Sequence, residues 1–250
     1  MYYLDLTNPQ VLEWCEQQTS HVISDYGIKL FRVDYNVSPI EYFHAVENDG
    51  IRECRAVRQC EGFYTLYRNL KKKFPDIIFE NCAGGGGTDL GMVRNFMHTW
   101  VSDNQIPPRS ALITNGMTMA LPPESVDRLV AGIGCHTIGS LDFHMRNAML
   151  THFSLNVFGQ SDCEMNPEVI GFIRHSVDLY KSFIRPFLPQ CNVYHHTPDT
   201  KDILKNGFLI IEDGAKDKTC GVIGIFSMTD TKSDVIKVYP KGINFSKIIE

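Results

Sequence analysis

Strand-like and helical segments alternate along the first 188 residues of this chain, and the early strand-like segments end in polar residues. Strands are expected at residues 28–35, 77–82, 97–102, 134–138 and 155–158. Helices are expected at residues 9–25, 57–73, 90–95 and 166–185. Such alternation predicts parallel pairing of the strands, and in a barrel of this type the chemistry lies at the carboxyl ends of the strands.

Five strands are too few to close an eight-stranded barrel, which by itself takes about 250 residues. After Pro186 and Pro189 the pattern changes to short β-like runs separated by Gly, Asp and Lys. These runs cover residues 207–212, 221–228 and 234–239. The sequence therefore predicts an α/β fold in which residues 1–188 form about the last five strands of a partial (β/α)8 TIM barrel. Residues 189–250 are expected to begin a C-terminal antiparallel β-sandwich that is incomplete.

The first helix has recognisable signals at both ends. Asn8 is a good capping residue, Pro9 suits the first helical turn, and Val11, Leu12 and Trp14 follow at helical spacing. Gly27 is expected to end the helix before the first strand begins.

Charge and hydropathy exclude several partners. The formal net charge is -5 and the basic residues are scattered, so no basic face is available to follow a nucleic-acid backbone. No apolar stretch approaches the roughly 20 residues that a membrane span requires. Residues 1–20 are too acidic and polar for a secretory signal. We therefore expect a cytoplasmic protein with no membrane or nucleic-acid partner, and the sequence leaves open whether it forms a homo-oligomer.

The first candidate site residues lie at the end of the strand at 28–35. Side chains two positions apart share one face of a strand, so Arg32, Asp34 and Asn36 are expected to point the same way. A neighbouring guanidinium favours the ionised form of Asp34, as a nucleophile requires. A structural ion pair at the rim of a barrel explains the same spacing.

Four consecutive glycines, at residues 84–87, follow the strand that ends at Cys82. Glycine runs occur where the chain turns sharply or approaches a ligand closely, although a flexible loop has the same composition. Thr88 and Asp89 stand where a phosphate-binding loop needs Lys followed by Ser or Thr, which argues against a phosphate site.

Asp103 follows the strand at 97–102, in the sequence Ser-Asp-Asn. Taken alone, it is typical of a turn or cap residue. Taken together with Asp34, it offers two carboxyl groups at the same rim, and two such groups can act on one glycosidic bond. A rival interpretation uses Asp34, Glu80 and Asp103 as ligands of Mg²⁺ in a proton-abstracting barrel enzyme.

Three segments together resemble successive motifs of glycoside hydrolase family 36, the melibiase-type α-galactosidases. They are residues 31–36 (Phe-Arg-Val-Asp-Tyr-Asn), 80–92 (Glu-Asn-Cys-Ala, four Gly, then Thr-Asp-Leu-Gly-Met) and 100–104 (Trp-Val-Ser-Asp-Asn). Their order and spacing match as well. The resemblance extends to about residue 190, and the later β-like runs are similar to the start of the family's C-terminal β-sandwich.

The resemblance implies a reaction and a set of residues. Asp34 would be the nucleophile and Asp103 the general acid/base of a retaining glycosidase that acts on terminal α-galactosides. Arg32, Asn36, Cys82, Gly84 and Gly85 would line the subsite for the terminal sugar. No metal and no cofactor are implied, and the expected partner is an oligosaccharide with terminal α-galactose.

Two departures from the family pattern bear on these expectations. Arg32 stands where the family usually has a Lys, and the two side chains bind hydroxyl groups with different geometry. The family's earlier strands, which supply an acidic pair and a Trp that hold galactose, have no counterpart here. The isolated 250 residues are therefore expected to be inactive, and α-N-acetylgalactosaminidase activity remains an alternative for the family.

Overall fold

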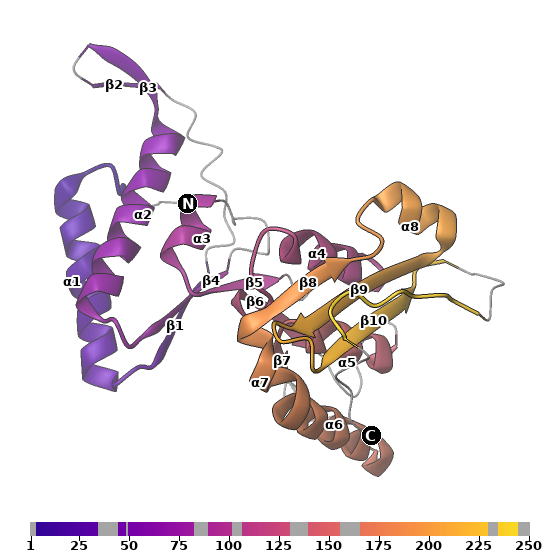
Figure 1. Ribbon diagram of the computed structural model, residues 1–250. Coiled ribbons are helices and arrows are strands. Elements are labelled where there is room, and N and C mark those ends of the chain that lie inside the picture. Colours follow the sequence, from indigo (N-terminus) through magenta and orange to yellow (C-terminus); the bar gives the residue numbers. More distant parts are fainter. Residues whose placement is uncertain are drawn as a thin grey trace. The chain divides into compact units, whose positions relative to one another are not determined.

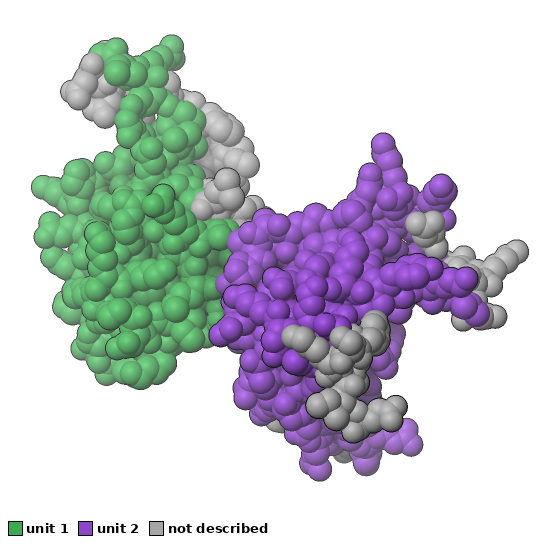
Figure 2. All heavy atoms as spheres, viewed as in Figure 1, with its two compact units in different colours: residues 1–100 green, residues 101–250 purple. Residues whose placement is uncertain are grey.

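The computed structural model describes the greater part of the chain. The described residues are 4–34, 45–48, 50–82, 90–101, 107–130, 140–155, 166–229 and 235–244. The chain divides into two compact units, Met1–Trp100 and Val101–Glu250, which Figure 2 colours separately. Among the helices that the structure describes, none combines the length and the apolar composition that a bilayer span requires.

The first unit alternates helices and parallel strands and also contains one hairpin. Its elements are α1 (Pro9–Tyr26), β1 (Leu30–Asp34), β2 (Ala45–Asn48), β3 (Ile51–Cys54), α2 (Arg55–Lys73), β4 (Ile78–Cys82), α3 (Leu90–Asn95) and β5 (His98–Val101). β4 pairs in parallel with both β1 and β5, whereas β2 and β3 pair antiparallel. The predicted helices and strands of this unit are confirmed to within a few residues, and the β2–β3 hairpin was not expected.

The ends of α1 form as the sequence predicts. The side chain of Asn8 accepts a hydrogen bond from the backbone N–H of Gln10 at 2.9 Å, and Pro9 opens the first turn. Gly27 ends the helix in the left-handed conformation, with φ 61°.

Gly27→Ala is expected to destabilise the chain by roughly 1–2 kcal/mol, because a Cβ strains a left-handed residue. A Cβ built at Gly27 meets no atom within 4 Å, so the backbone conformation is the only source of this cost. Urea unfolding measures it. Gly116→Ala in α4 (Arg109–Thr118) is the control, because its Cβ also meets nothing and a helical Ala is favoured. Equal effects at the two positions would contradict the explanation.

The core of the first unit lies on one face of its parallel strands. Leu70 of α2 and Phe79 of β4 have no exposed surface, and Phe31 and Val33 of β1 pack against the same cluster. Figure 1 shows α1 and α2 running side by side, and both helices contribute to this core. The helices therefore cover the Phe31 and Phe79 face, and the opposite face of β1 and β4 carries the polar side chains.

The second unit holds two further parallel strands, their helices and an antiparallel sheet. Its first part contains α4, a 3-10 turn (Pro123–Ser125), β6 (Val126–Val130), α5 (Leu141–Met149), β7 (His152–Leu155), α6 (Pro167–Leu179), a π-helical segment (Tyr180–Ile184), α7 (Arg185–Phe187) and a 3-10 turn (Leu188–Gln190). Its last part contains β8 (Cys191–His195), α8 (Thr200–Asn206), β9 (Phe208–Ala215) and β10 (Gly221–Ser227). β6 and β7 are parallel, and β9 lies between β8 and β10 in an antiparallel sheet.

The predicted fold class is confirmed. The parallel strands follow the order β1-β4-β5-β6-β7, and a separate three-stranded antiparallel sheet comes after them in the chain. The antiparallel sheet begins at Cys191. The predicted domain boundary between residues 188 and 189 stays a prediction.

Three sequence expectations for the second unit need comment. The strand expected at 134–138 lies outside the described residues, and the strand β6 was missed. The prediction of a β-like run at 234–239 was wrong for residues 235–239, which form no strand. Just after this run, the backbone N–H groups of Lys241 and Gly242 donate to the buried carboxylate of Glu212.

The last helical segment continues past Pro186, where the sequence predicted its end. A Pro in the first turn of α7 needs no N–H donor, and a wider π-helical turn precedes it.

Candidate active site

The side chains of β1 alternate between core and surface. Phe31 and Val33 are half-buried against the hydrophobic cluster, whereas Arg32 and Asp34 are exposed. Arg32 and Asp34 therefore share the face opposite the helices, as their spacing predicts. Asp34 is the last residue of the strand, so its carboxyl group lies at the carboxyl end.

Parallel pairing brings two residues of β4 next to this pair. Arg32 is in register with Glu80, and Asp34 is in register with Cys82. Because Phe79 points into the core, the alternation places Glu80 and Cys82 on the same face as Arg32 and Asp34. Glu80 has no exposed surface and Cys82 is also buried.

The guanidinium of Arg32 is held by two groups. Its Nε–H donates to Oε1 of Glu80 in an ion pair. Its Cζ lies 3.6 Å from the ring centroid of Trp100 on β5, so the guanidinium covers the face of the indole ring. On the far side of Glu80, Nδ1 of His98 lies 3.6 Å from Oε2. Arg32, Glu80 and His98 thus form one row of register partners across the parallel strands β1, β4 and β5.

The other predicted site residues do not belong to the described part of the chain. They are Asn36, Gly84, Gly85 and Asp103. Of the predicted set, the structure therefore brings together Arg32, Asp34 and Cys82.

A family model for Melibiase matches residues 1–184. The chain belongs to the melibiase family. An α-galactosidase of Escherichia coli is 26% identical over 160 residues, which are 62% of this chain and 22% of that protein. α-Galactosidase C of Emericella nidulans is 29% identical over 136 residues, which are 51% of this chain and 18% of that protein. The family resemblance found in the sequence is confirmed.

A solved structure extends the likeness to the whole fold. It is a variant of the family 36 α-galactosidase AgaA from Geobacillus stearothermophilus in complex with stachyose, with a TM-score of 0.80 and 20% sequence identity. The match covers 97% of this chain and 33% of that one. This melibiase chain thus spans about a fifth of the length of the curated relatives and a third of the solved structure.

Sequence reasoning missed the partner of Arg32. The expected ion pair joined Arg32 to Asp34, and Glu80 was expected only as a possible Mg²⁺ ligand, whereas the structure pairs Arg32 with Glu80. A usable signal was present. Glu80 stands two residues before Cys82, so the period of a strand already placed it on the face that was expected to bind sugar.

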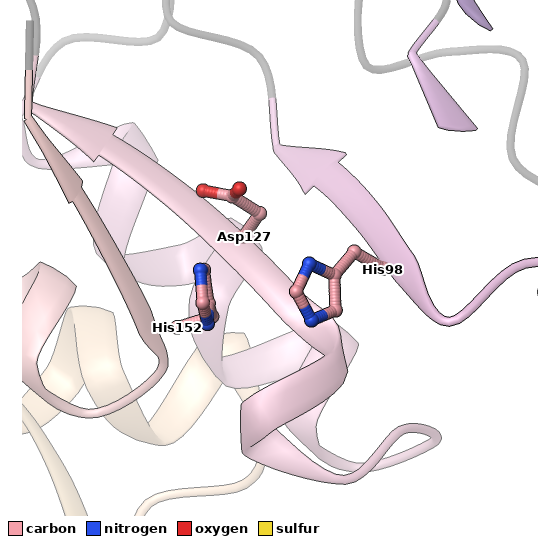
Figure 3. Close-up of side chains that lie close together, drawn as sticks. All are labelled: His98, Asp127 and His152. Carbon is pink, nitrogen blue, oxygen red and sulfur yellow. The ribbon is translucent and has the colours of Figure 1, made fainter. Parts of the chain in front are cut away.

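Titratable side chains also occur at the amino ends of strands in each unit. Figure 3 shows Asp127, the second residue of β6, and His152, the first residue of β7, which are register partners in the second unit. The figure also labels His98, the first residue of β5 in the first unit. These three residues belong to the amino ends of their strands. They are therefore unlike Asp34, which occupies the carboxyl end where barrel enzymes carry their chemistry.

Proposed function

We propose that the protein containing this chain is a retaining α-galactosidase that removes terminal α-galactose from oligosaccharides. The observation that supports this most is the exposed carboxylate of Asp34 at the carboxyl end of β1, next to Arg32 and in register with Cys82. The names of the relatives point the same way, and one of the solved family 36 structures is a complex with stachyose.

In the proposed reaction, the Asp34 carboxylate attacks the anomeric carbon of the terminal α-galactoside, and the protonated Asp103 donates its proton to the departing glycosidic oxygen. A covalent β-galactosyl ester of Asp34 results. Asp103, now ionised, removes a proton from water, and the water attacks the same carbon and releases α-galactose. The mechanism requires the two carboxyl groups to lie about 5 to 5.5 Å apart, and we expect this separation between Asp34 and Asp103.

The proposed sugar subsite combines described and undescribed residues. Arg32 would donate to sugar hydroxyl groups, and Cys82 would line the floor beside Asp34. Asn36 and the backbone at Gly84 and Gly85 would complete the subsite. Arg32 is well suited to this role because its guanidinium is held in one orientation while its side chain stays 39% exposed.

The domain division is part of the same proposal. Residues 1–188 would supply barrel strands that carry the two aspartates, and residues 189–250 would begin a β-sandwich. A complete pocket then needs further barrel strands in addition to these residues, so the isolated 250 residues are expected to be inactive.

The test is the anomeric form of the first product. The protein as encoded by its gene is expected to hydrolyse an aryl α-galactoside with or without a chelator, and proton NMR is expected to detect α-galactose before mutarotation produces the β form. A retaining mechanism requires this order, because two inversions occur at the anomeric carbon.

Other outcomes would support the rival functions. β-Galactose as the first product would contradict the nucleophilic role of Asp34. Hydrolysis that requires Mg²⁺ would favour the metal-dependent alternative. If the protein hydrolysed only an aryl α-N-acetylgalactosaminide, the proposed substrate would be wrong and the proposed mechanism would stand. Absence of hydrolysis of either glycoside would mean that the protein keeps the motifs without the activity.

A further inference from the structure

We infer that Glu80 and Trp100 are positioning residues that fix the Arg32 guanidinium so that its two terminal nitrogens face a pair of adjacent, uncharged sugar hydroxyl groups. This inference deepens the proposed function and rests on it. Neither Glu80 nor Trp100 belongs to the sugar-binding set that the sequence predicted.

Glu80 is fixed inside the protein. Its side chain has no exposed surface, and burying a carboxylate costs several kcal/mol unless a cation or hydrogen-bond donors compensate. The Nε–H of Arg32 supplies one such donor. Because the buried end of this ion pair cannot move, the half-exposed end takes its position from Glu80.

Trp100 restricts the guanidinium in a second direction. The ion pair with Glu80 lies at the Nε edge of the guanidinium, whereas the Trp100 ring covers one of its faces. Trp100 is only 6% exposed, so its ring provides a rigid surface. Among the described residues, these two contacts occupy one edge and one face of the guanidinium, so the edge that carries the two terminal nitrogens can face a ligand.

The charges in this cluster select the kind of ligand. Glu80 balances the positive charge of Arg32, and Asp34 adds a negative charge on the same face of β1. A carboxylate on the substrate, as in a uronic acid, would be repelled by Asp34 and would gain little from a guanidinium that is already paired. Two parallel N–H groups suit two neighbouring hydroxyl oxygens instead. A Lys at position 32 has neither a planar face for Trp100 nor a fork for two oxygens.

The first test follows Trp100 directly and needs no activity. The 250-residue chain contains two Trp residues, Trp14 and Trp100, so Trp14→Phe in this chain leaves Trp100 as its only Trp. In this background, Glu80→Gln and Arg32→Lys are each expected to raise acrylamide quenching of Trp100 about twofold, because the guanidinium no longer covers the ring. Glu61→Gln is the control, since it breaks the ion pair between Glu61 and Arg58 at 2.7 Å on the surface of α2.

The second test concerns the clamp, by which we mean Glu80 and Trp100 holding the Arg32 guanidinium. It asks whether the clamped guanidinium binds sugar hydroxyl groups. In the protein as encoded, Glu80→Gln and Arg32→Lys are each expected to lower kcat/KM for an aryl α-galactoside about 10-fold or more, mainly through KM. A set of monodeoxy-galactosides then locates the contact. For one or two of these substrates the loss caused by Glu80→Gln should disappear, because the hydroxyl group that Arg32 binds is already missing.

The outcomes separate the inference from the function on which it rests. Hydrolysis by the wild-type protein, with equal Glu80→Gln losses on every deoxy substrate, would overturn the positioning role and leave the α-galactosidase proposal intact. Unchanged Trp100 quenching in both variants would overturn the clamp itself. If the quenching changes as expected but the wild-type protein hydrolyses no α-galactoside, the proposed function fails, and the sugar-binding part of the inference fails with it. Circular dichroism confirms that each variant folds.

Discussion

Asp34→Ala is expected to lower kcat for an aryl α-galactoside by a factor of about 10³ or more, because the covalent step loses its nucleophile. Sodium azide should restore part of the activity. Removing the carboxylate leaves room for a small anion on the β face of the anomeric carbon, and the reaction then proceeds by a single inversion. The expected product is β-galactosyl azide, identified by NMR.

Asp103→Ala is expected to respond differently to the same reagent. A substrate with an activated leaving group can still form the galactosyl ester, since little proton donation is needed. The ester then accumulates because no general base activates water, a role that contributes about 10²–10⁴-fold. Azide needs no deprotonation and attacks the ester from the α face. The expected product is α-galactosyl azide.

The pair of azide products tests the assignment of roles residue by residue. Exchanged products would reverse the roles of Asp34 and Asp103. Absence of azide products from both variants, with the wild-type protein active, would remove the two aspartates from the reaction. Asp76→Ala is a suitable control, because Asp76 is an exposed carboxylate in the turn before β4 and should leave kcat unchanged.

The sequence predicts the helices and parallel strands of the first unit well, although not its β2–β3 hairpin, because those elements obey local rules. Asn8 and Gly27 mark the ends of α1 through a side-chain cap and a left-handed residue, both of which are local features of the chain. Phe31 and Val33 alternate with polar residues at the period of a strand, so the core face of β1 can be recognised before any partner is known.

β6 was missed because it does not obey those rules. Its sequence is Val-Asp-Arg-Leu-Val, and two charged residues in the middle of five argue against a buried strand. In the structure Asp127 is 2% exposed and Arg128 is 1% exposed. Charged residues can be buried in this way only when distant parts of the chain provide partners, and sequence patterns do not report such partners.

Part of the candidate site also follows from local sequence rules, and part of it does not. The position of Asp34 at a strand end and its shared face with Arg32 follow from a period of two residues. The clamp on Arg32 depends instead on the register between β1, β4 and β5, which brings Glu80 and Trp100 from 48 and 68 positions later in the chain. Register is set by pairing between strands, so no local pattern around Arg32 contains it.

The Asp213→Asn variant is expected to lose much of the pH dependence of unfolding that the wild-type chain shows in neutral solution. Asp213 of β9 is fully buried, and neither of its carboxyl oxygens accepts a hydrogen bond from a described residue. Burial, with a smaller contribution from the neighbouring carboxylate of Glu212, raises the pKa of Asp213 from 3.8 to about 8. The folded chain therefore keeps this proton over a range of pH in which the unfolded chain has lost it.

The sign of the effect follows from proton binding. Between about pH 4 and about pH 8 the folded state binds the Asp213 proton and the unfolded state does not, so raising the pH favours unfolding. The contribution of Asp213 to stability is complete below pH 3.8 and is lost as the pH rises to about 8, at about 1.4 kcal/mol per pH unit. Asn has nearly the same shape and carries no ionisable proton, so the variant should match the wild type in acid and exceed its stability near pH 8.

Urea unfolding of both proteins at several pH values inside this window measures the difference in slope. Asp202→Asn on α8 is the matched control, because an exposed side chain stays hydrated in the folded and unfolded chains and should leave the slope unchanged. Equal slopes for the wild-type and Asp213→Asn proteins would mean that Asp213 is ionised in the folded chain. A buried carboxylate in that state needs a compensating cation nearby. The antiparallel sheet would then depend on an ion pair at Asp213, in place of the uncharged carboxyl group that the raised pKa predicts.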